Sequence, residues 1–216
     1  MRWTVCKTSN GMKINHVIRT MIVSDFYLNA GLSLYGPIFA IFITQQIQGG
    51  DLRVVGFGAA ITQIVKCIFE IPIARYLDKN HGEYDDFISL VTGNFLFVAV
   101  PFLYLFASKV SHVYLIQALA GLSTALIVPP WSAIFSRHLD KSQESTEWSF
   151  ESVGIGIAAG GAAAIGGIIA EKFGFRFVFL AGGFLVILGA IEQLKIFADL
   201  KKKVPRGAVK PQPDVI

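Results

Sequence analysis

Apolar residues along this chain gather in six long stretches, which short polar connections separate. A helix rises about 1.5 Å per residue and needs ~20 residues to cross ~30 Å of hydrocarbon, and each stretch is close to that length. The third and fourth stretches are the clearest, because no charged side chain interrupts them. The pattern therefore predicts six membrane-spanning helices, over residues 21–44, 54–77, 87–107, 113–136, 152–170 and 175–197.

The composition supports an all-α membrane protein. Hydrophobic residues make up 53% of the chain and charged residues 16%, and the mean hydropathy is +0.57, whereas a soluble chain carries about 25% charged residues. We expect one compact transmembrane domain over residues 21–197, between a polar segment at 1–20 and a disordered polar tail at 198–216. The first segment lacks an apolar core behind a charged start, so a cleavable secretory signal is not indicated.

Basic residues are distributed unevenly between the two ends of the predicted helices. Fourteen Lys and Arg residues fall on the side of the two termini, and four fall on the opposite side. Because basic residues favour the cytoplasmic side of a membrane, we expect both termini to be cytoplasmic in a multi-pass protein of the inner or plasma membrane. The net charge of +4 then reflects topology, and no nucleic-acid partner is expected.

Three charged residues, Asp25, Lys66 and Glu70, fall inside the predicted spans. A charge at mid-bilayer costs about 2.5 to 3.5 kcal/mol, so each needs a partner or a water-filled cavity. Lys66 and Glu70 are four residues apart and share a helix face, and Asp25 lies at a similar depth, so the three can form one cluster. Two interpretations stay open: an ion pair that only fixes helix packing, or a site for a solute or a coupled proton.

Uncharged polar residues extend this candidate site. Asn29 continues the face of Asp25 on the first helix, and Gln117 and Thr124 lie at helical spacing on the fourth. The predicted cavity for a solute or ion is therefore lined by Asp25, Asn29, Lys66, Glu70, Gln117 and Thr124.

The fifth span is rich in glycine and alanine. Gly156, Gly160 and Ala164 recur every four residues, which lets a neighbouring helix approach closely and predicts a helix interface. A dinucleotide-binding loop is not indicated, because such a loop follows a strand in water. No nucleophile, base and orienting group converge, so an enzyme is not expected. The four histidines lie at or outside the span ends, so neither a metal nor another cofactor is expected.

Three segments resemble motifs of the major facilitator superfamily of secondary transporters. Residues 74–82 are similar to its cytoplasmic loop after the second helix, with Asp78 and Lys79 in the place of the Asp-Arg pair. Residues 117–134 resemble its fourth helix, and residues 166–179 resemble its fifth helix and the start of the sixth. Gln117 stands where the family's fourth helix carries an arginine associated with proton coupling, so the resemblance does not imply such coupling.

The resemblance implies one six-helix half of a twelve-helix fold, most like the N-terminal half, built as two inverted three-helix repeats. It further implies that helices one and four line a cavity, helices two and five meet the other half, helices three and six face lipid, and Asp78 and Lys79 belong to a gating loop. On this basis we expect a half-transporter, paired with itself or with a second half, that moves a small solute through the lipid membrane by alternating access. The alternative is a non-transporting membrane scaffold or assembly partner with a transporter-derived fold.

Overall fold

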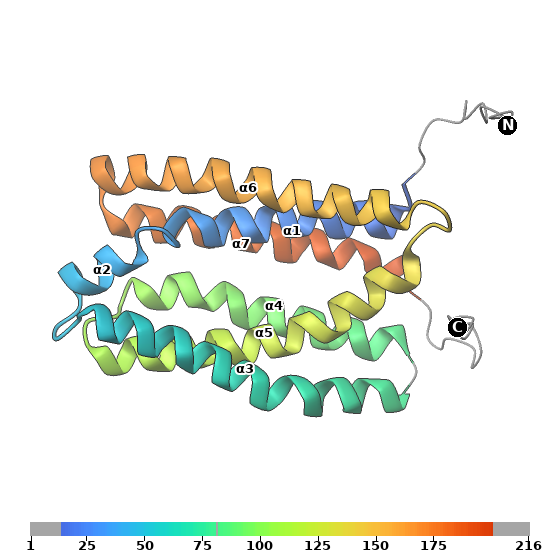
Figure 1. The fold of residues 1–216 in the computed structure, drawn as a ribbon, viewed down its shortest axis with the longest axis horizontal. Coiled ribbons are helices and arrows are strands. Elements are labelled where there is room, and N and C mark those ends of the chain that lie inside the picture. The colour runs from blue at the N-terminus through green and yellow to red at the C-terminus, as the bar shows by residue number, and fades with distance from the viewer. Residues whose placement is uncertain (1–13, 81, 201–216) are drawn as a thin grey trace, which may run out of the picture.

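The computed structural model describes residues 14–80 and 82–200, and within these ranges the chain folds almost entirely as helices (Figure 1). Five of the helices are long and apolar enough to cross a membrane, and a bent pair, α1 with α2, makes a sixth span when it is counted as one. The elements are α1 (His16–Tyr35), α2 (Phe39–Gln46), α3 (Leu52–Asn80), α4 (Glu83–Tyr104), α5 (Val110–His138), α6 (Glu144–Phe173), α7 (Phe175–Gln193) and the 3-10 helix η1 (Leu194–Asp199).

The first span is broken, which the uninterrupted apolar stretch did not predict. α1 ends at Tyr35, α2 begins at Phe39, and the two helices are bent by 42° at the break. Pro37 lies in this break. Because proline has no backbone N–H and its ring clashes with the preceding turn, it interrupts a helix at this point.

The six spans form two inverted repeats of three. The first repeat is α1 with α2, α3 and α4, and the second is α5, α6 and α7 with η1. α1 packs against α6 and α7 of the second repeat, whereas α5 packs against α3 and α4 of the first (Figure 1). The first, or leading, helix of each repeat thus packs among the helices of the other repeat. Because each repeat has three spans, the second repeat runs through the membrane in the opposite direction to the first.

The two ends of the described chain meet at one end of the bundle. His16 Nδ1 at the start of α1 lies 2.9 Å from Asp199 Oδ2 at the end of η1, and Asn15 Nδ2 donates to the carbonyl of His138 at 3.3 Å. Since successive spans reverse direction, the connections after α3 and α5 lie at this same end. The opposite end holds the connections after α2, α4 and α6. Lys109 lies in one of them, Arg53 lies in the first turn of α3, and Lys172 lies in the last turn of α6.

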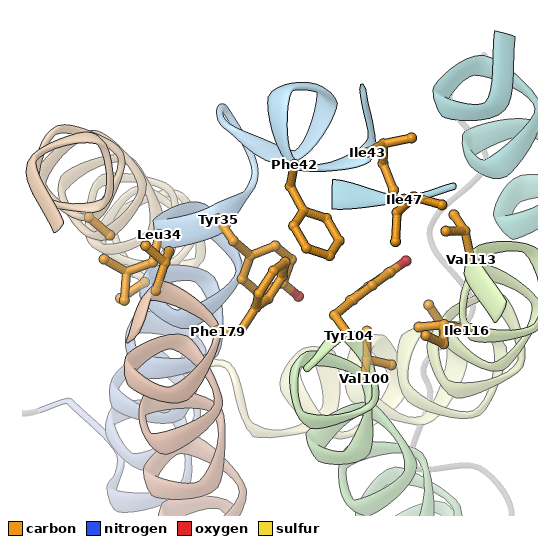
Figure 2. Close-up of a cluster of buried hydrophobic side chains, with 14 of the residues drawn as sticks. Leu34, Tyr35, Phe42, Ile43, Ile47, Val100, Tyr104, Val113, Ile116 and Phe179 are labelled. Carbon is orange, nitrogen blue, oxygen red and sulfur yellow. The ribbon is translucent and has the colours of Figure 1, made fainter. Parts of the chain in front are cut away.

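Two apolar clusters close the interior at either end. At the α2 end, Tyr35, Phe42, Tyr104 and Phe179 converge from four helices (Figure 2). The ring of Phe179 lies 4.8 Å from that of Phe42 and 5.4 Å from that of Tyr104, measured between centroids. At the other end a second cluster packs the start of α1 against α4, α5 and η1, and its core comprises Val17, Ile18, Met21, Phe87, Leu90, Ile134, Phe135, Ile196 and Leu200.

The spans differ in how much of their surface the chain itself covers. α3 and α6 bury the smallest share of their residues, and α4 and α7 bury a larger share. α3 exposes Phe57 and Ile68, for example, and α6 exposes Ile157 and Ile168. The second and fifth spans therefore carry broad apolar faces that nothing in the described chain covers.

Candidate functional site

A cavity of about 820 Å³ lies between two groups of helices, α1 with α6 and α7 on one side and α3 with α4 and α5 on the other. α1, α4, α5 and α6 supply most of its wall, and α3 contributes one residue. The wall is mainly apolar, with polar side chains at intervals, which is typical of a small-molecule site. Its polar and aromatic residues are Asp25, Asn29, Tyr35, Phe39, Thr62, Asn94, Phe97, Tyr104, Gln117, Thr124, Trp131, Ser132, Trp148, Glu151 and Ser152.

Four of the six residues predicted to line a cavity do line it: Asp25, Asn29, Gln117 and Thr124. Asp25 and Asn29 are one helical turn apart on α1, and the Asn29 amide donates to the carbonyl of Asp25 at 2.9 Å. The Thr124 hydroxyl donates to the carbonyl of Ala120 at 2.8 Å. The sequence periodicity therefore identified the inward faces of α1 and α5, and a role of these residues in binding a solute stays a prediction.

The remaining two predicted residues, Lys66 and Glu70, are not among the described residues that line the cavity. The Lys66 ammonium instead lies 3.8 Å from the Glu70 carboxylate on the same face of α3. Because α3 packs mainly against α5, whereas α1 packs against α6 and α7, this pair is separated from Asp25. The single cluster of three charges that the sequence allowed is therefore not formed: Lys66 and Glu70 make an ion pair on α3, and Asp25 lies in the cavity wall.

Asp25 meets a different partner, the carboxyl group of Glu151 on α6. The two carboxyl groups lie close enough to interact directly, and both line the cavity. Only 4% of Glu151 is exposed to solvent. The indole N–H of Trp131 on α5 lies near the Asp25 carboxyl without completing a hydrogen bond. Three helices thus bring two acids and an indole donor together at one place in the wall.

Several polar atoms in the cavity wall have no hydrogen-bond partner among the described residues. They are the hydroxyls of Tyr35 and Tyr104, both amide atoms of Asn94, the Trp131 Nε1 atom and both carboxyl oxygens of Glu151. Buried polar groups are normally hydrogen-bonded, because leaving one unpaired costs about 1 to 3 kcal/mol. Their concentration around one cavity indicates a place that water or a polar ligand fills.

Gln117 connects two helices at the edge of this cavity. The Thr62 hydroxyl of α3 donates to Gln117 Oε1 at 2.5 Å, and it also lies 2.9 Å from the carbonyl oxygen of the same residue. Gly58, one turn earlier on α3, leaves room for the Gln117 side chain, whose Cγ would be 3.3 Å from an added Cβ. The amide therefore fixes α3 against α5 as well as facing the cavity.

The two residues assigned to a gating loop, Asp78 and Lys79, lie in the last turn of α3, which continues to Asn80. Asp78 is close enough to Asp86 on α4 to interact electrostatically. Asp86 in turn accepts a hydrogen bond from Arg137 of α5 in a largely buried ion pair. The ion pair joins the ends of α4 and α5, and Asp78 of α3 adds a like charge beside it. The gating role of Asp78 and Lys79 stays a prediction.

The predicted helix interface on α6 faces away from the rest of the described chain. Gly156, Gly160 and Ala164 are exposed, and a Cβ added at either glycine would meet nothing within 4 Å. The face toward α1 is formed instead by Ala158 and Gly166, and an added Cβ on Gly166 would collide with the Leu34 carbonyl. Gly156, Gly160 and Ala164 therefore do share one face of α6, but the close contact with α1 is made by a different face.

Glu151, Asn94 and the two tryptophans in the wall were not predicted from the sequence. Glu151 lies one residue before the predicted fifth span and was counted with the connection, yet α6 begins at Glu144. A signal for it was present, because Glu151, Ala158 and Ala162 repeat at helical spacing on one face. Asn94 is an isolated polar residue in an apolar span, and Trp131 and Trp148 carry no signal that distinguishes a cavity wall from a packed core.

Comparison with known proteins agrees with this architecture. The model of the Major Facilitator Superfamily matches residues 22–215. The chain is similar to an uncharacterized MFS-type transporter, MJ1560 of Methanocaldococcus jannaschii, with 23% identity over 188 residues that cover 87% of this chain and 47% of the relative. The chain thus spans about half the length of the curated relative it matches.

A solved structure supports the fold. The chain is similar to the POT family transporter PepTSo, whose in meso crystal structure superposes with a TM-score of 0.74 at 15% identity, over 93% of this chain and 40% of that one. At this identity the likeness shows the fold alone. It confirms the prediction of half of a transporter fold of the matched superfamily.

Proposed function

The chain belongs to the Major Facilitator Superfamily, and we propose that it moves a small solute across a membrane by alternating access. The observation that carries the proposal is the cavity between the two inverted repeats, whose wall presents polar groups without partners. Inverted repeats of this kind place a solute near the bilayer midplane and expose it to each side in turn. Family membership favours a transporter over an enzyme.

In this proposal Asp25, Asn29, Gln117 and Thr124 contact the solute. All four line the cavity, and they come from the leading helices of the two repeats. Lys66 and Glu70 support α3 through their own ion pair, and Asp78 and Lys79 contribute to a charged contact that opens and closes with the helix ends. Both termini are cytoplasmic, which agrees with the excess of basic residues on their side.

A second six-helix half completes the transporter. It is supplied by a second copy of this chain, by another protein or by the rest of a longer chain. Support comes from the share of the relative that the chain covers, 47%, and from the exposed apolar faces of α3 and α6. Gly156, Gly160 and Ala164 are the proposed contact positions on α6, since small residues there leave the backbone open to close approach.

Accessibility of the cavity from both sides of the membrane tests this function. Cys6 and Cys67 are first replaced by serine, and Thr124→Cys is then introduced in the cavity wall. A membrane-impermeant maleimide is applied to sealed right-side-out and inside-out vesicles. We expect labelling in both preparations, because alternating access exposes this position to each side. Phe184→Cys on the exposed apolar face of α7 is the matched control and should react in neither.

A static scaffold gives a different result. Its cavity is open to one side at most, so Thr124→Cys would react in one preparation or in neither. That result would reject alternating access, whatever the protein binds.

A further inference from the structure

The cavity wall is acidic and carries no base. Among the described residues that line it, Asp25 and Glu151 are the acidic side chains, and there is no Lys, Arg or His. Their carboxyl groups, one from α1 and one from α6, both line the cavity and lie close enough to interact. Two carboxylates at such close range repel each other unless a proton or a cation lies between them.

Aromatic rings stand beside the acids. Trp131 and Trp148 both line the cavity, and their ring centroids are 6.0 Å apart with the planes at 60°. Phe135 packs against both, with its centroid 4.8 Å from that of Trp131 and 4.6 Å from that of Trp148, and so holds them in place. Indole faces attract cations, most strongly where water is excluded.

We propose that the solute is an organic cation, a protonated amine or a quaternary ammonium or phosphonium ion with an apolar body, held by Asp25 and Glu151 and flanked by Trp131 and Trp148. This inference rests on the proposed function and names the class of solute. A cation at this position neutralises the repulsion between the carboxyl groups. It also occupies a site where the oxygens of Glu151 have no hydrogen-bond donor among the described residues.

The size and lining of the cavity select an organic ion. Ca²⁺ and Mg²⁺ take about six or more oxygen ligands at short distances, whereas here two carboxyl groups are accompanied by indole and phenyl rings. The volume of about 820 Å³ accommodates a bulky apolar body. The unpartnered amide of Asn94 and hydroxyl of Tyr104 lie farther along the wall and offer hydrogen bonds to polar groups on such a body.

A pair of probes that differ in the sign of their charge tests the proposal. Tetraphenylphosphonium and tetraphenylborate have nearly the same size and shape and carry opposite charges. Binding of each radiolabelled ion to the purified full chain in detergent is measured by equilibrium dialysis. We expect saturable binding of the phosphonium ion and none of the borate.

Variants then assign the binding to the two acids. Asp25→Asn and Glu151→Gln should each weaken phosphonium binding at least tenfold, and Trp148→Ala should weaken it severalfold. Glu171→Gln on the exposed face near the end of α6 is the matched control, and it should bind as the unmodified chain does. Thermal unfolding in the same detergent establishes that each variant is folded, and the isosteric Asn and Gln replacements keep the shape of the wall.

Three results would overturn the proposal: no saturable phosphonium binding by the unmodified chain, equal binding of the borate, or unchanged binding after both acids are replaced. Two-sided labelling of Thr124→Cys together with any of these results would leave the transporter in place and reject its cationic solute. One-sided labelling together with carboxyl-dependent phosphonium binding would instead keep the cation site and reject alternating access.

Discussion

Gly31 of α1 and Gly182 of α7 bring two helix backbones into contact. A Cβ atom added to Gly31 would lie 2.6 Å from the carbonyl oxygen of Gly182, and one added to Gly182 would lie 2.8 Å from that of Gly31. No side chain larger than hydrogen fits between them without separating the helices. We therefore expect Gly31→Ala to lower the free energy of unfolding by about 1 to 3 kcal/mol, the usual cost of overpacking. The midpoint of thermal unfolding in detergent measures the change.

Gly167→Ala provides the matched control. Gly167 is also helical, but an added Cβ there meets nothing within 4 Å. Alanine is favoured over glycine inside a helix by about 0.5 to 1 kcal/mol, so this variant should be at least as stable as the unmodified chain. Equal loss of stability in the two variants would show that the contact between α1 and α7 does not set the response, because helix propensity alone would raise the stability of both.

Close contacts of this kind recur with the symmetry of the two repeats. Gly121 of α5 approaches the carbonyl of Thr62 on α3, and Gly166 of α6 approaches the carbonyl of Leu34 on α1. Each contact joins the leading helix of one repeat to the second helix of the other. Small residues allow close helix packing in a membrane, where hydrophobic burial adds little. The exchanged arrangement of the repeats therefore depends on a glycine at each of these two contacts, on the leading helix in one and on the second helix in the other.

The ion pair between Asp86 and Arg137 should stabilise the contact of α4 with α5. The carboxyl side of the pair is almost fully buried, at 3% exposure, and the guanidinium side is 30% exposed. Asp86→Asn leaves a partly buried arginine without its counter-charge, so we expect a loss of about 2 to 3 kcal/mol in stability. This is less than the ~3 to 5 kcal/mol of a fully buried pair, because the guanidinium is partly exposed. Thermal unfolding in detergent measures it.

Asp85→Asn is the control for that change, because Asp85 is adjacent in sequence but only half-buried. It should alter stability by less than about 0.5 kcal/mol. The double variant Asp86→Asn with Arg137→Gln should lose less than the sum of the two single changes, because the pair is then removed as a unit. Strict additivity would mean that the two side chains do not interact.

The sequence predicted the spans and the inward faces of two helices for definite physical reasons. Hydrocarbon thickness sets the length of each apolar stretch, and a period of 3.6 residues puts Asp25 and Asn29 on one face of α1. The break near Pro37 was missed because apolar residues continue on both sides of it, and hydropathy does not register a lost backbone hydrogen bond. Glu151 was missed because α6 extends beyond the apolar segment that defined it.

Partners across helices were harder to predict than faces within one. Asp25, Lys66 and Glu70 lie at comparable depths, and depth alone allowed them to meet. Which helices are neighbours depends on the exchange of leading helices between repeats, and no local pattern encodes this exchange. The acid that joins Asp25 therefore comes from α6, a helix distant in sequence, whereas Lys66 and Glu70 satisfy each other within one turn of α3.

The exposed small residues of α6 give a prediction about assembly. If α6 contacts a second half, Gly156→Cys and Gly160→Cys in a chain lacking Cys6 and Cys67 should cross-link in native membranes under mild oxidation. A product of twice the chain's mass of 23.6 kDa would identify a second copy, and a product of another mass would identify a different partner. Gel electrophoresis without reductant measures the yield.

Phe184→Cys controls for random collision, since this residue of α7 is 60% exposed on an apolar face outside the proposed interface. The α6 positions should give severalfold more product than this control. A yield no higher than that of Phe184→Cys would place the α6 face against lipid and remove it as the contact between halves.

The separation of Asp25 from the Lys66–Glu70 ion pair predicts opposite responses to charge changes at these two places. Exchanging Lys66→Glu with Glu70→Lys rebuilds the pair in the orientation that helices prefer, with the acid nearer the amino end, and leaves the cavity wall intact. We expect this double variant to restore uptake or growth in a strain that lacks the gene. Asp25→Asn should insert at normal abundance, verified by immunoblot, yet reduce uptake to background, because it changes the wall itself. If the exchanged pair abolished uptake at normal abundance, the solute path would have to run past α3 as well.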